Sequence, residues 1–136
     1  MKTGEDLCPC QSGDEYITCC GLLLENGLIA KTAEQLMRSR YTAYTLGKSD
    51  YLLQTWHPSQ RPQSLSIETA VKWLGLQVLA TLAGGEVDNA GQVEFIARYK
   101  YQGKAIRLQE NSRFIRESGR WYYLDAANNP GLTPKS

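Results

Sequence analysis

The sequence predicts an α+β fold in which helices pack on a curved antiparallel sheet, preceded by a short cysteine-rich segment. Three observations predict it. All four cysteines lie between positions 8 and 20. Apolar residues then recur near the helical period of about 3.6 as far as position 56, and from position 74 they alternate with a period of 2. Helices followed by a meander of strands are typical of α+β domains with the helices on one sheet face.

The 136 residues are expected to form three parts: a cysteine-rich unit over 1–25, an α+β domain over 26–128 and a flexible tail over 129–136. A chain of this length buries a sizeable core without covalent help. The net charge of +1 indicates no polyanionic partner, although residues 1–30 carry five acids against Lys2 alone. No apolar run approaches the length of a membrane span, and no signal peptide is recognisable at the start. We therefore expect a cytoplasmic protein.

The first helix is expected to begin after Thr32, because Thr32 and Gln35 form a capping-box pattern. Gly47 suits the left-handed residue that follows a helix C-terminus. Between these signals the apolar residues keep helical spacing, at Ala33, Leu36, Met37, Tyr41 and Tyr44.

A second, shorter helix is expected over 50–56, with Ser49 as its cap and His57-Pro58 as its end. His57 is the only histidine, and we expect it to bond one of the last helical carbonyls. A role as ligand or general base is the alternative. A loop follows over 58–66, and one more helical turn over 67–72 is an open alternative before the first strand.

Four strands are expected in the second half, where apolar residues alternate with polar ones. Turns rich in glycine and asparagine separate the strands, and the last two turns are the tight pairs Gln102-Gly103 and Ser118-Gly119. The expected strands span 74–82, 93–101, 105–116 and 121–124.

The cysteines occur as two close pairs, Cys8-Pro9-Cys10 and Cys19-Cys20, with eight residues between them. Zn²⁺ favours four soft ligands at tetrahedral corners, and thiolates supply them without redox chemistry. Four protein ligands leave no coordination position for a catalytic water. The pattern therefore predicts one structural zinc ion held by Cys8, Cys10, Cys19 and Cys20.

Other interpretations of the cysteines stay open beside zinc. Disulfides would require an oxidising compartment, and a bridge between the neighbours Cys19 and Cys20 would be strained. A thioredoxin-like redox site requires Cys-x-x-Cys beside a βαβ pattern, which the sequence lacks. Another metal or an iron–sulfur cluster could use the same thiolates, although the spacing differs from the usual cluster runs. Zinc is favoured among these.

The stretch CPCQSGDEYITCC, residues 8–20, resembles the SEC-C motif, a zinc knuckle first seen in the SecA translocation ATPase. Residues 38–58 (RSRYTAYTLGKSDYLLQTWHP) and 110–126 (ENSRFIRESGRWYYLDA) resemble the YchJ-like family of bacterial proteins. The likeness runs from Leu7 to about residue 127. It implies a SEC-C knuckle followed by a nuclear-transport-factor-two-like domain, a cystatin-like cone of helices on a curved sheet. We call residues 1–25 the knuckle and 26–128 the cone domain.

The resemblance implies an interaction or accessory module, because SEC-C knuckles elsewhere are implied to contact the SecB chaperone or the ribosome. A protein or ribonucleoprotein partner is expected at the knuckle loop, through Gln11, Asp14, Glu15 and Tyr16. The acidic tip favours a basic protein over bare nucleic acid, whose phosphates would repel it. We expect no DNA or membrane partner, and the cone domain would supply a second contact or a homodimer face.

A second candidate site is expected inside the cone. On the third strand Glu110, Ser112 and Phe114 share one face, so a core-facing Phe114 would bring the Glu110 carboxylate inward. A buried carboxylate requires a partner or a raised pKa, and either would mark a candidate site. The expected pocket residues are Tyr41, Tyr44, His57, Trp73, Glu110 and Ser112, with Arg38 or Arg40 as counter-charge.

This pocket supports an alternative function, a small-molecule-binding protein or an enzyme with Glu110 as base. The competing interpretation pairs Glu110 with an arginine of the first helix, which would fix the packing without any chemistry. The family pattern leads us to expect a histidine before Glu110, where this chain has Gln109, and that weakens a His–Glu pair. No catalytic residue is assigned, and a function without catalysis is favoured.

Overall fold

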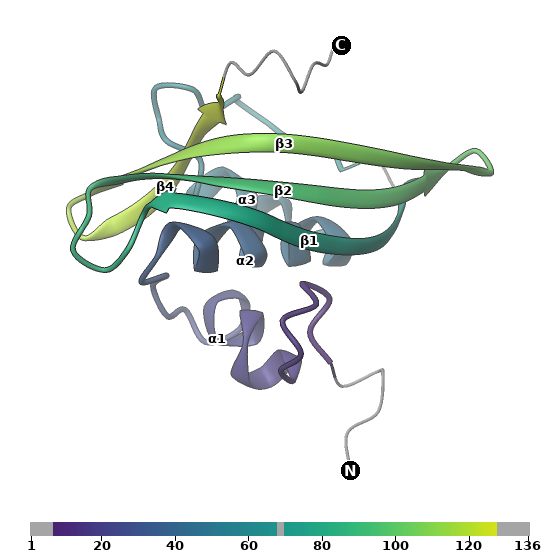
Figure 1. Ribbon diagram of the computed structural model, residues 1–136, viewed down its shortest axis with the longest axis horizontal. Helices are drawn as coiled ribbons and strands as arrows, with labels where there is room; N and C mark the ends of the chain where they lie inside the picture. The colour runs from purple at the N-terminus through teal and green to yellow at the C-terminus, as the bar shows by residue number, and fades with distance from the viewer. Residues whose placement is uncertain (1–6, 68–69, 128–136) are drawn as a thin grey trace.

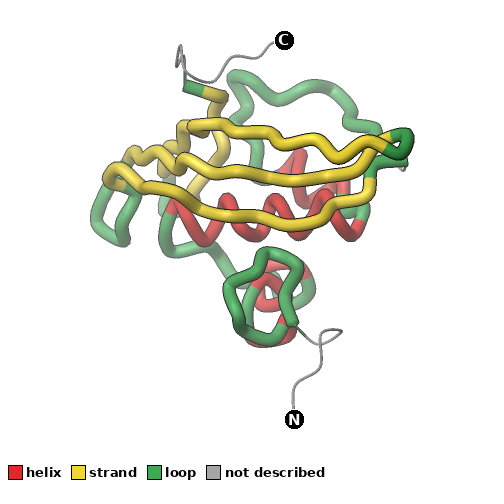
Figure 2. The backbone as a smooth tube through the Cα atoms, turned by 45° about the vertical axis from the view of Figure 1, so that its right-hand side comes forward, coloured by secondary structure: helices red, strands yellow, loops and turns green. Residues whose placement is uncertain are grey.

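The computed structural model describes residues 7–67 and 70–127, and the expected tail over 129–136 lies outside them. A four-stranded antiparallel sheet covers the helices on one side, and the knuckle lies on their other side (Figure 1). Figure 2 shows the same three layers from a second direction, with the knuckle as a compact loop next to the helices. The α+β class and the curved antiparallel sheet predicted from the sequence are confirmed.

The elements follow the expected order. The helical half consists of η1 (Tyr16–Thr18), α1 (Cys20–Leu24), α2 (Ala33–Leu46) and α3 (Ser49–Gln54). The sheet half consists of β1 (Lys72–Ala83), β2 (Ala90–Tyr101), β3 (Lys104–Glu117) and β4 (Arg120–Ala126). The strands lie in the order β1-β2-β3-β4, so each pairs with its neighbour in sequence. Since Lys72 already belongs to β1, the alternative helical turn does not extend to that residue.

Local signals place both ends of α2. The Thr32 hydroxyl accepts the backbone N–H of Gln35 at 3.0 Å, as the capping pattern predicts. The Gln35 side chain bonds the N–H of Lys31 instead of Thr32, at 2.7 Å, so the reciprocal half of the box is shifted by one residue. At the other end Gly47 has φ 74°, and its N–H bonds the carbonyls of the last turn.

The expected second helix is shorter than predicted. Ser49 is the first residue of α3 and not its cap, and the helix ends at Gln54 instead of 56. Beyond it the chain pairs with β4, because the Tyr123 N–H bonds the Thr55 carbonyl and the His57 N–H bonds the Tyr123 carbonyl, both at 2.8 Å. These long-range bonds draw the chain out of the helix.

Tight turns and bulges shape the sheet. The pairs Gln102-Gly103 (φ 52° and 79°) and Ser118-Gly119 (φ 52° and 81°) join the last three strands. Two adjacent residues with positive φ match the twist of the flanking strands in a two-residue hairpin. Register shifts occur twice along β1 and once between β3 and β4. Because such bulges bend a strand and increase its twist, the sheet curves over α2.

The hairpin between β1 and β2 locks onto the start of α2. The Gly84 carbonyl accepts the N–H of Ala33 at 2.9 Å. A Cβ at Gly91 would lie 2.4 Å from the Gly84 Cα, so only glycine permits the two strand ends to approach this closely.

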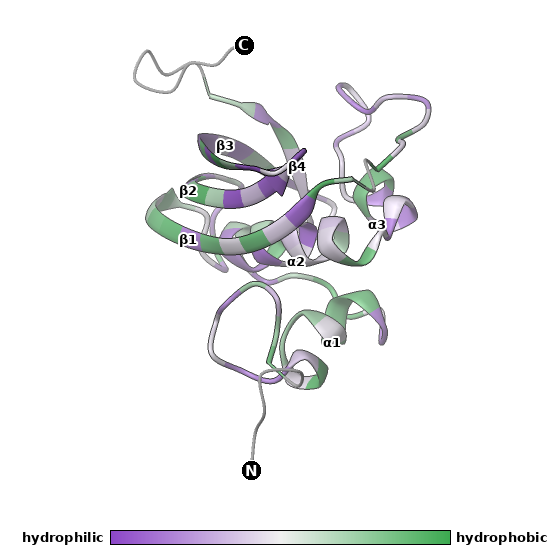
Figure 3. Ribbon diagram, turned by 90° about the vertical axis from the view of Figure 1, so that its right-hand side faces the viewer, coloured by the Kyte–Doolittle hydropathy of each residue, from purple (hydrophilic) through white to green (hydrophobic). Residues whose placement is uncertain are grey.

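A single hydrophobic cluster joins the knuckle to the cone domain. It contains Cys8, Cys10, Cys20 and Leu23 from the knuckle together with apolar residues of α2 and the sheet. Figure 3 shows the apolar residues of α1 and of the chain after it beside α2. The core residues beyond the knuckle include Leu36, Met37, Tyr41, Leu76, Val93, Ala97, Phe114 and Trp121. The knuckle therefore packs as part of the fold, and the boundary expected after residue 25 stays a prediction.

Within the ranges that the structure describes, no helix has both the length and the apolar character that a bilayer crossing requires.

Candidate metal centre and cone pocket

The four cysteines meet at one point beside α2. Their Sγ atoms all lie within 4.8 Å of one another, and 3.7 Å separates Cys10 Sγ from Cys19 Sγ. Cys8, Cys10 and Cys20 are buried, whereas Cys19 is half-buried. All four are free thiols, so the disulfide interpretation has no support in this geometry.

Local backbone structure brings the two pairs together. The Cys8 N–H bonds the Asp14 carbonyl at 2.9 Å, and a positive φ at Gln11 (63°) and at Gly13 (94°) reverses the chain between them. The short η1 then delivers Cys19, whose N–H bonds the Tyr16 carbonyl at 3.0 Å. Since α1 begins at Cys20, the second pair straddles the start of a helix.

The sulfur positions fit a zinc-sized ion. A tetrahedral ion with Zn–S bonds of about 2.3 Å places neighbouring sulfurs about 3.8 Å apart. The observed 3.7 Å between Cys10 Sγ and Cys19 Sγ agrees, and no two of the four sulfurs are more than 4.8 Å apart. The residues present therefore fit a four-thiolate metal site, as the sequence predicts.

The pKa values of Cys8, Cys19 and Cys20 shift in different directions, because each thiol has different hydrogen bonds and a different burial. Hydrogen bonds with Cys10 and Cys20 lower the pKa of Cys8, whereas hydrogen bonds with Cys10 and Cys8, together with burial, raise the pKa of Cys20. Burial raises the pKa of Cys19 to about 11, against the hydrogen bond with Ser12. A divalent cation binds the deprotonated form of a cysteine, so metal binding at this site would release the thiol protons.

Two hydroxyl groups turn toward the sulfurs. Thr42 Oγ1, on α2, donates to Cys20 Sγ at 3.3 Å and lies 3.8 Å from Cys8 Sγ. Ser12 Oγ lies 3.2 Å from Cys19 Sγ. Donors of this kind stabilise thiolate charge and orient the ligands of a metal. Thr42 is fully buried and was not among the residues predicted; a threonine on the apolar face of a predicted helix was the available signal.

Two further contacts fix the knuckle on the cone domain. Arg38 Nη1 donates to the Cys10 carbonyl at 2.8 Å. Gln11 Oε1 accepts the N–H of Leu76 at 3.1 Å, and so covers an open hydrogen-bonding group at the edge strand β1. A Cβ at Gly75 would lie 2.9 Å from Gln11 Oε1, so the glycine makes room for this amide.

The residues expected to face a partner differ in their freedom. Asp14 is exposed, whereas Glu15 and Tyr16 are half-buried. The Tyr16 hydroxyl donates to Glu25 at 2.8 Å. Gln11 is exposed, but its amide oxygen already accepts the N–H of Leu76 in the sheet. Next to them lies Ile17, an apolar residue that is 70% exposed and was not among the predicted contact residues.

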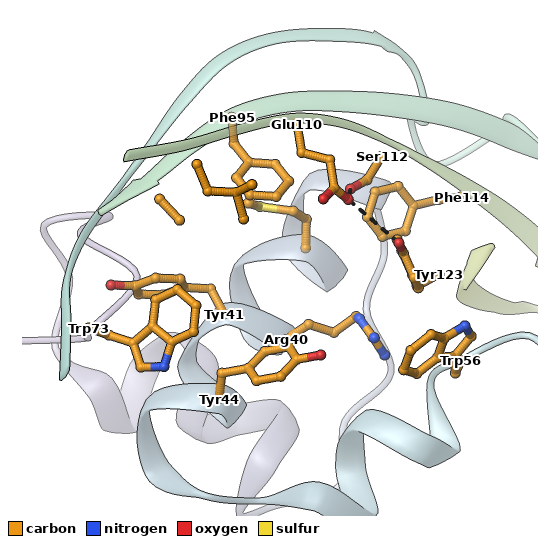
Figure 4. A pocket seen from close by; sticks show the side chains of 13 residues that line it. Arg40, Tyr41, Tyr44, Trp56, Trp73, Phe95, Glu110, Ser112, Phe114 and Tyr123 are labelled. Carbon is orange, nitrogen blue, oxygen red and sulfur yellow. Dashed lines mark hydrogen bonds between the residues drawn. The ribbon is translucent and has the colours of Figure 1, made fainter. Parts of the chain in front are cut away.

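A cavity of about 310 Å³ lies between α2 and the concave face of the sheet (Figure 4). We call it the cone pocket. Its volume is at the lower end of the range for small-molecule sites, roughly 300 to 1,000 Å³. The structure brings five of the six expected residues to it, Tyr41, Tyr44, Trp73, Glu110 and Ser112, together with Arg40, one of the two expected counter-charges. It adds Met37, Trp56, Phe95, Ala97, Leu108, Phe114 and Tyr123.

His57 does not line this pocket, contrary to expectation, and its ring bonds no helical carbonyl. Its Nδ1 accepts the N–H of Ser59 at 3.2 Å, and its Nε2 lies 3.1 Å from Glu117 Oε1. The pairing of the 55–57 segment with β4 turns the ring away from the cavity. His57 therefore joins a loop to the end of β3.

Arg40 lies at the pocket with its charge largely removed from water. It is 6% exposed, and its Nη1 donates to the Leu52 carbonyl at 2.8 Å and to Thr55 Oγ1 at 2.7 Å. The guanidinium carbon sits 4.7 Å from the ring centre of Tyr123 and 5.3 Å from that of Trp56. Burial lowers the pKa of Arg40.

Glu110 approaches the same space from β3. Its Oε2 accepts the hydroxyl of Ser112 at 2.7 Å and that of Tyr123 at 3.5 Å. No ion pair with Arg38 or Arg40 forms in the described structure: Arg38 pairs with Glu34 instead, at 3.0 Å. The interpretation of Glu110 as one half of a packing salt bridge is therefore wrong.

Comparisons with known proteins identify both parts of the chain. The family described as "YchJ, middle NTF2-like domain" matches residues 32–126, and the SEC-C motif matches residues 6–22. A UPF0225 protein of Chromobacterium violaceum is 53% identical over 127 residues, which cover 90% of this chain and 93% of the relative. One of Bordetella pertussis is 50% identical over 121 residues, covering 87% and 90%.

Two solved structures share the fold. The solution structure of a SEC-C motif containing protein from Rhodopseudomonas palustris has a TM-score of 0.78 at 36% identity, covering 90% of this chain and 98% of that one. The crystal structure of another, from Psychrobacter arcticus, has a TM-score of 0.70 at 29% identity, covering 95% and 84%. The chain therefore belongs to the YchJ-like family of UPF0225 proteins, with a SEC-C motif followed by an NTF2-like domain.

Proposed function

We propose that the protein is a zinc-held docking module, in which one Zn²⁺ ion fixes the knuckle so that it can contact a protein or ribosomal surface. The observation that carries the proposal is the set of four cysteine sulfurs within 4.8 Å, three of them in buried residues. Four protein ligands complete a tetrahedral shell, so such an ion would hold shape and bind no substrate.

The donor set favours zinc over the other ions considered. Soft thiolates at tetrahedral corners suit Zn²⁺ or iron–sulfur chemistry and are poor ligands for Mg²⁺ or Ca²⁺. An iron–sulfur cluster distributes the four thiolates over two or more irons, so that thiolates on different irons lie further apart than the 4.8 Å observed. A single ion at the centre of the four sulfurs satisfies all of them at once.

The surface around the knuckle loop supports a docking role. Ile17 and Thr18 in η1 are exposed beside the exposed Asp14. In this proposal Ile17 is the apolar centre of the contact, and the polar residues around it form the rim. Residues 1–30 contain more acidic than basic residues, which favours a basic partner surface such as that of a ribosomal protein.

The proposal is tested with purified bacterial ribosomes and the zinc-loaded protein. Elemental analysis is expected to give one zinc per chain, and the protein is expected to co-sediment with the ribosomes. Removing the metal with a chelator should abolish co-sedimentation, because the loop that presents Asp14 and Ile17 loses its shape.

A matched pair of surface variants separates docking from general stickiness. Ile17→Ser removes the exposed apolar group of the knuckle, and Val87→Ser removes one that is 89% exposed in the β1–β2 turn. We expect the first to weaken ribosome binding severalfold and the second to leave it unchanged. Binding that survives both chelation and Ile17→Ser would contradict the docking role.

A further inference from the structure

The cone pocket contains a positive charge that the described part of the chain does not pair with an acid. Arg40 uses Nη1 for Leu52 and Thr55, and no hydrogen bond from Nε or Nη2 is formed within the described residues. A guanidinium has five N–H donors, so three of them are left for other partners. Because Arg40 lines the pocket and is nearly buried otherwise, the pocket is the space open to these donors.

A negative charge lies across the same space. Figure 4 shows the Glu110 carboxylate and the Arg40 guanidinium pointing toward the pocket from β3 and from α2. Only Oε2 of Glu110 has hydrogen-bond partners in the described structure, so Oε1 remains available. Removing a charge from water without a partner is unfavourable, and this makes the buried Arg40 and the half-buried Glu110 receptive to a ligand of opposite charge.

Aromatic rings form the walls between and beside these charges. Trp73 packs against Tyr41 with ring centres 5.6 Å apart and against Tyr44 at 5.9 Å. Near Arg40 the rings of Trp56 and Tyr123 present their faces. A flat or branched apolar group would be in contact with such walls, and an ammonium group would be attracted to ring faces.

From this geometry we infer that the cone pocket binds a small organic zwitterion, with its carboxylate at Arg40 and its ammonium group at Glu110. The apolar body of the ligand lies against the rings of Tyr41 and Trp73. A ligand with one charge would leave the opposite charge of the pocket unpaired, and an apolar ligand would leave both unpaired. The volume of about 310 Å³ equals roughly ten water molecules, which suits an amino acid or a molecule of similar size.

The test measures binding of three zwitterions to the full-length, zinc-loaded protein by calorimetry. L-Phenylalanine and L-leucine carry both charges on one carbon and differ in their apolar side chains, whereas 4-(aminomethyl)benzoate separates the charges across an aromatic ring. Two relatives with one charge are the controls: 3-phenylpropionate lacks the ammonium group, and phenethylamine lacks the carboxylate. We expect at least one zwitterion to bind about tenfold more tightly than either control, as the loss of one charged hydrogen bond predicts.

Variants assign the two ends of the ligand. Glu110→Gln is expected to weaken the zwitterion about tenfold and to leave the affinity for 3-phenylpropionate unchanged. Glu94→Gln is the matched control, because Glu94 lies on the neighbouring strand and bonds Gln109 outside the pocket. Arg40→Gln should weaken the binding of every ligand that carries a carboxylate. Because Arg40 also bonds the Leu52 carbonyl of α3, Glu110→Gln is the deciding variant if the Arg40→Gln variant does not fold.

The proposal is overturned if none of the three zwitterions binds at millimolar concentration. It is equally overturned if 3-phenylpropionate or phenethylamine binds as tightly as the best zwitterion, or if Glu110→Gln has no more effect than Glu94→Gln. None of these outcomes depends on ribosome binding by the knuckle, so the two proposals stand or fall separately.

Discussion

The knuckle and the cone pocket differ in whether their polar groups have partners within the chain. In the knuckle four sulfurs lie within 4.8 Å of one another, and the hydroxyls of Ser12 and Thr42 turn toward them. In the cone pocket Arg40 and Glu110 share one cavity without forming an ion pair. One site gathers its partners from within the chain, whereas the other leaves donors and acceptors open.

This difference separates a site that holds shape from a site that can receive something. When a metal ion binds to a closed set of four ligands, the free energy of binding stabilises the ordered knuckle. An open pair of charges has no such internal partner and gains from a ligand that supplies both. Variants that remove a metal ligand should therefore have large structural effects, and variants of the residues around the ligands should have smaller ones.

The largest effect is expected from opening the metal centre. Cys10→Ser removes a fully buried sulfur, and with it zinc binding and a metal-derived stability on the order of 10 kcal/mol by analogy with zinc-finger peptides. Elemental analysis should show no bound zinc, and amide exchange should become fast over 7–25. The sheet and α2 should keep their protection, because Leu36, Val93 and Phe114 still pack together.

Ser12→Ala is the control for that variant, since Ser12 contacts Cys19 Sγ without being a ligand candidate. It should keep one zinc per chain. If Cys10→Ser also retained one zinc per chain, ligation by four thiolates would be refuted. Loss of protection throughout β2 and β3 would show instead that the cone domain cannot hold its fold without the knuckle.

An intermediate effect is expected at Thr42, which supports the centre from α2. Thr42→Val keeps the shape of the side chain but removes the hydroxyl that donates to Cys20 Sγ. We expect zinc affinity to fall about 10- to 100-fold, as for other groups that orient metal ligands. Competition with a chromogenic chelator measures the change. Thr45→Val removes a hydroxyl bonded only to the Thr42 carbonyl and should leave the affinity unaltered.

Local features of the fold were predictable because neighbouring residues determine them. Thr32 caps α2, Gly47 ends it, and the two-residue turn at Ser118-Gly119 closes the last hairpin. The grouping of the cysteines followed from the chemistry of the sulfurs and their spacing. In each case the interacting groups lie close together in sequence, so one short stretch carries the whole signal.

Contacts between distant segments account for what the sequence did not predict. α3 ends early because Thr55 and His57 pair with Tyr123, far along the chain. The same pairing keeps His57 out of the cone pocket and holds Tyr123, which was not predicted there, at its wall. Periodicity shows which face of an element is buried, but not which distant group lies opposite.

The smallest effect is expected at the contact between the two regions, where Gln11 of the knuckle bonds the N–H of Leu76 at the edge of β1. Gln11→Ala should lower the free energy of unfolding by about 1 kcal/mol and leave zinc in place, because one hydrogen bond is lost and no ligand changes. The readout is amide exchange at Leu76, which should accelerate, whereas Gln77→Ala, an exposed amide on the same strand, should not change it. Unaltered exchange at Leu76 together with weaker ribosome binding would instead assign Gln11 to the partner surface, because the amide would then serve a contact outside the chain.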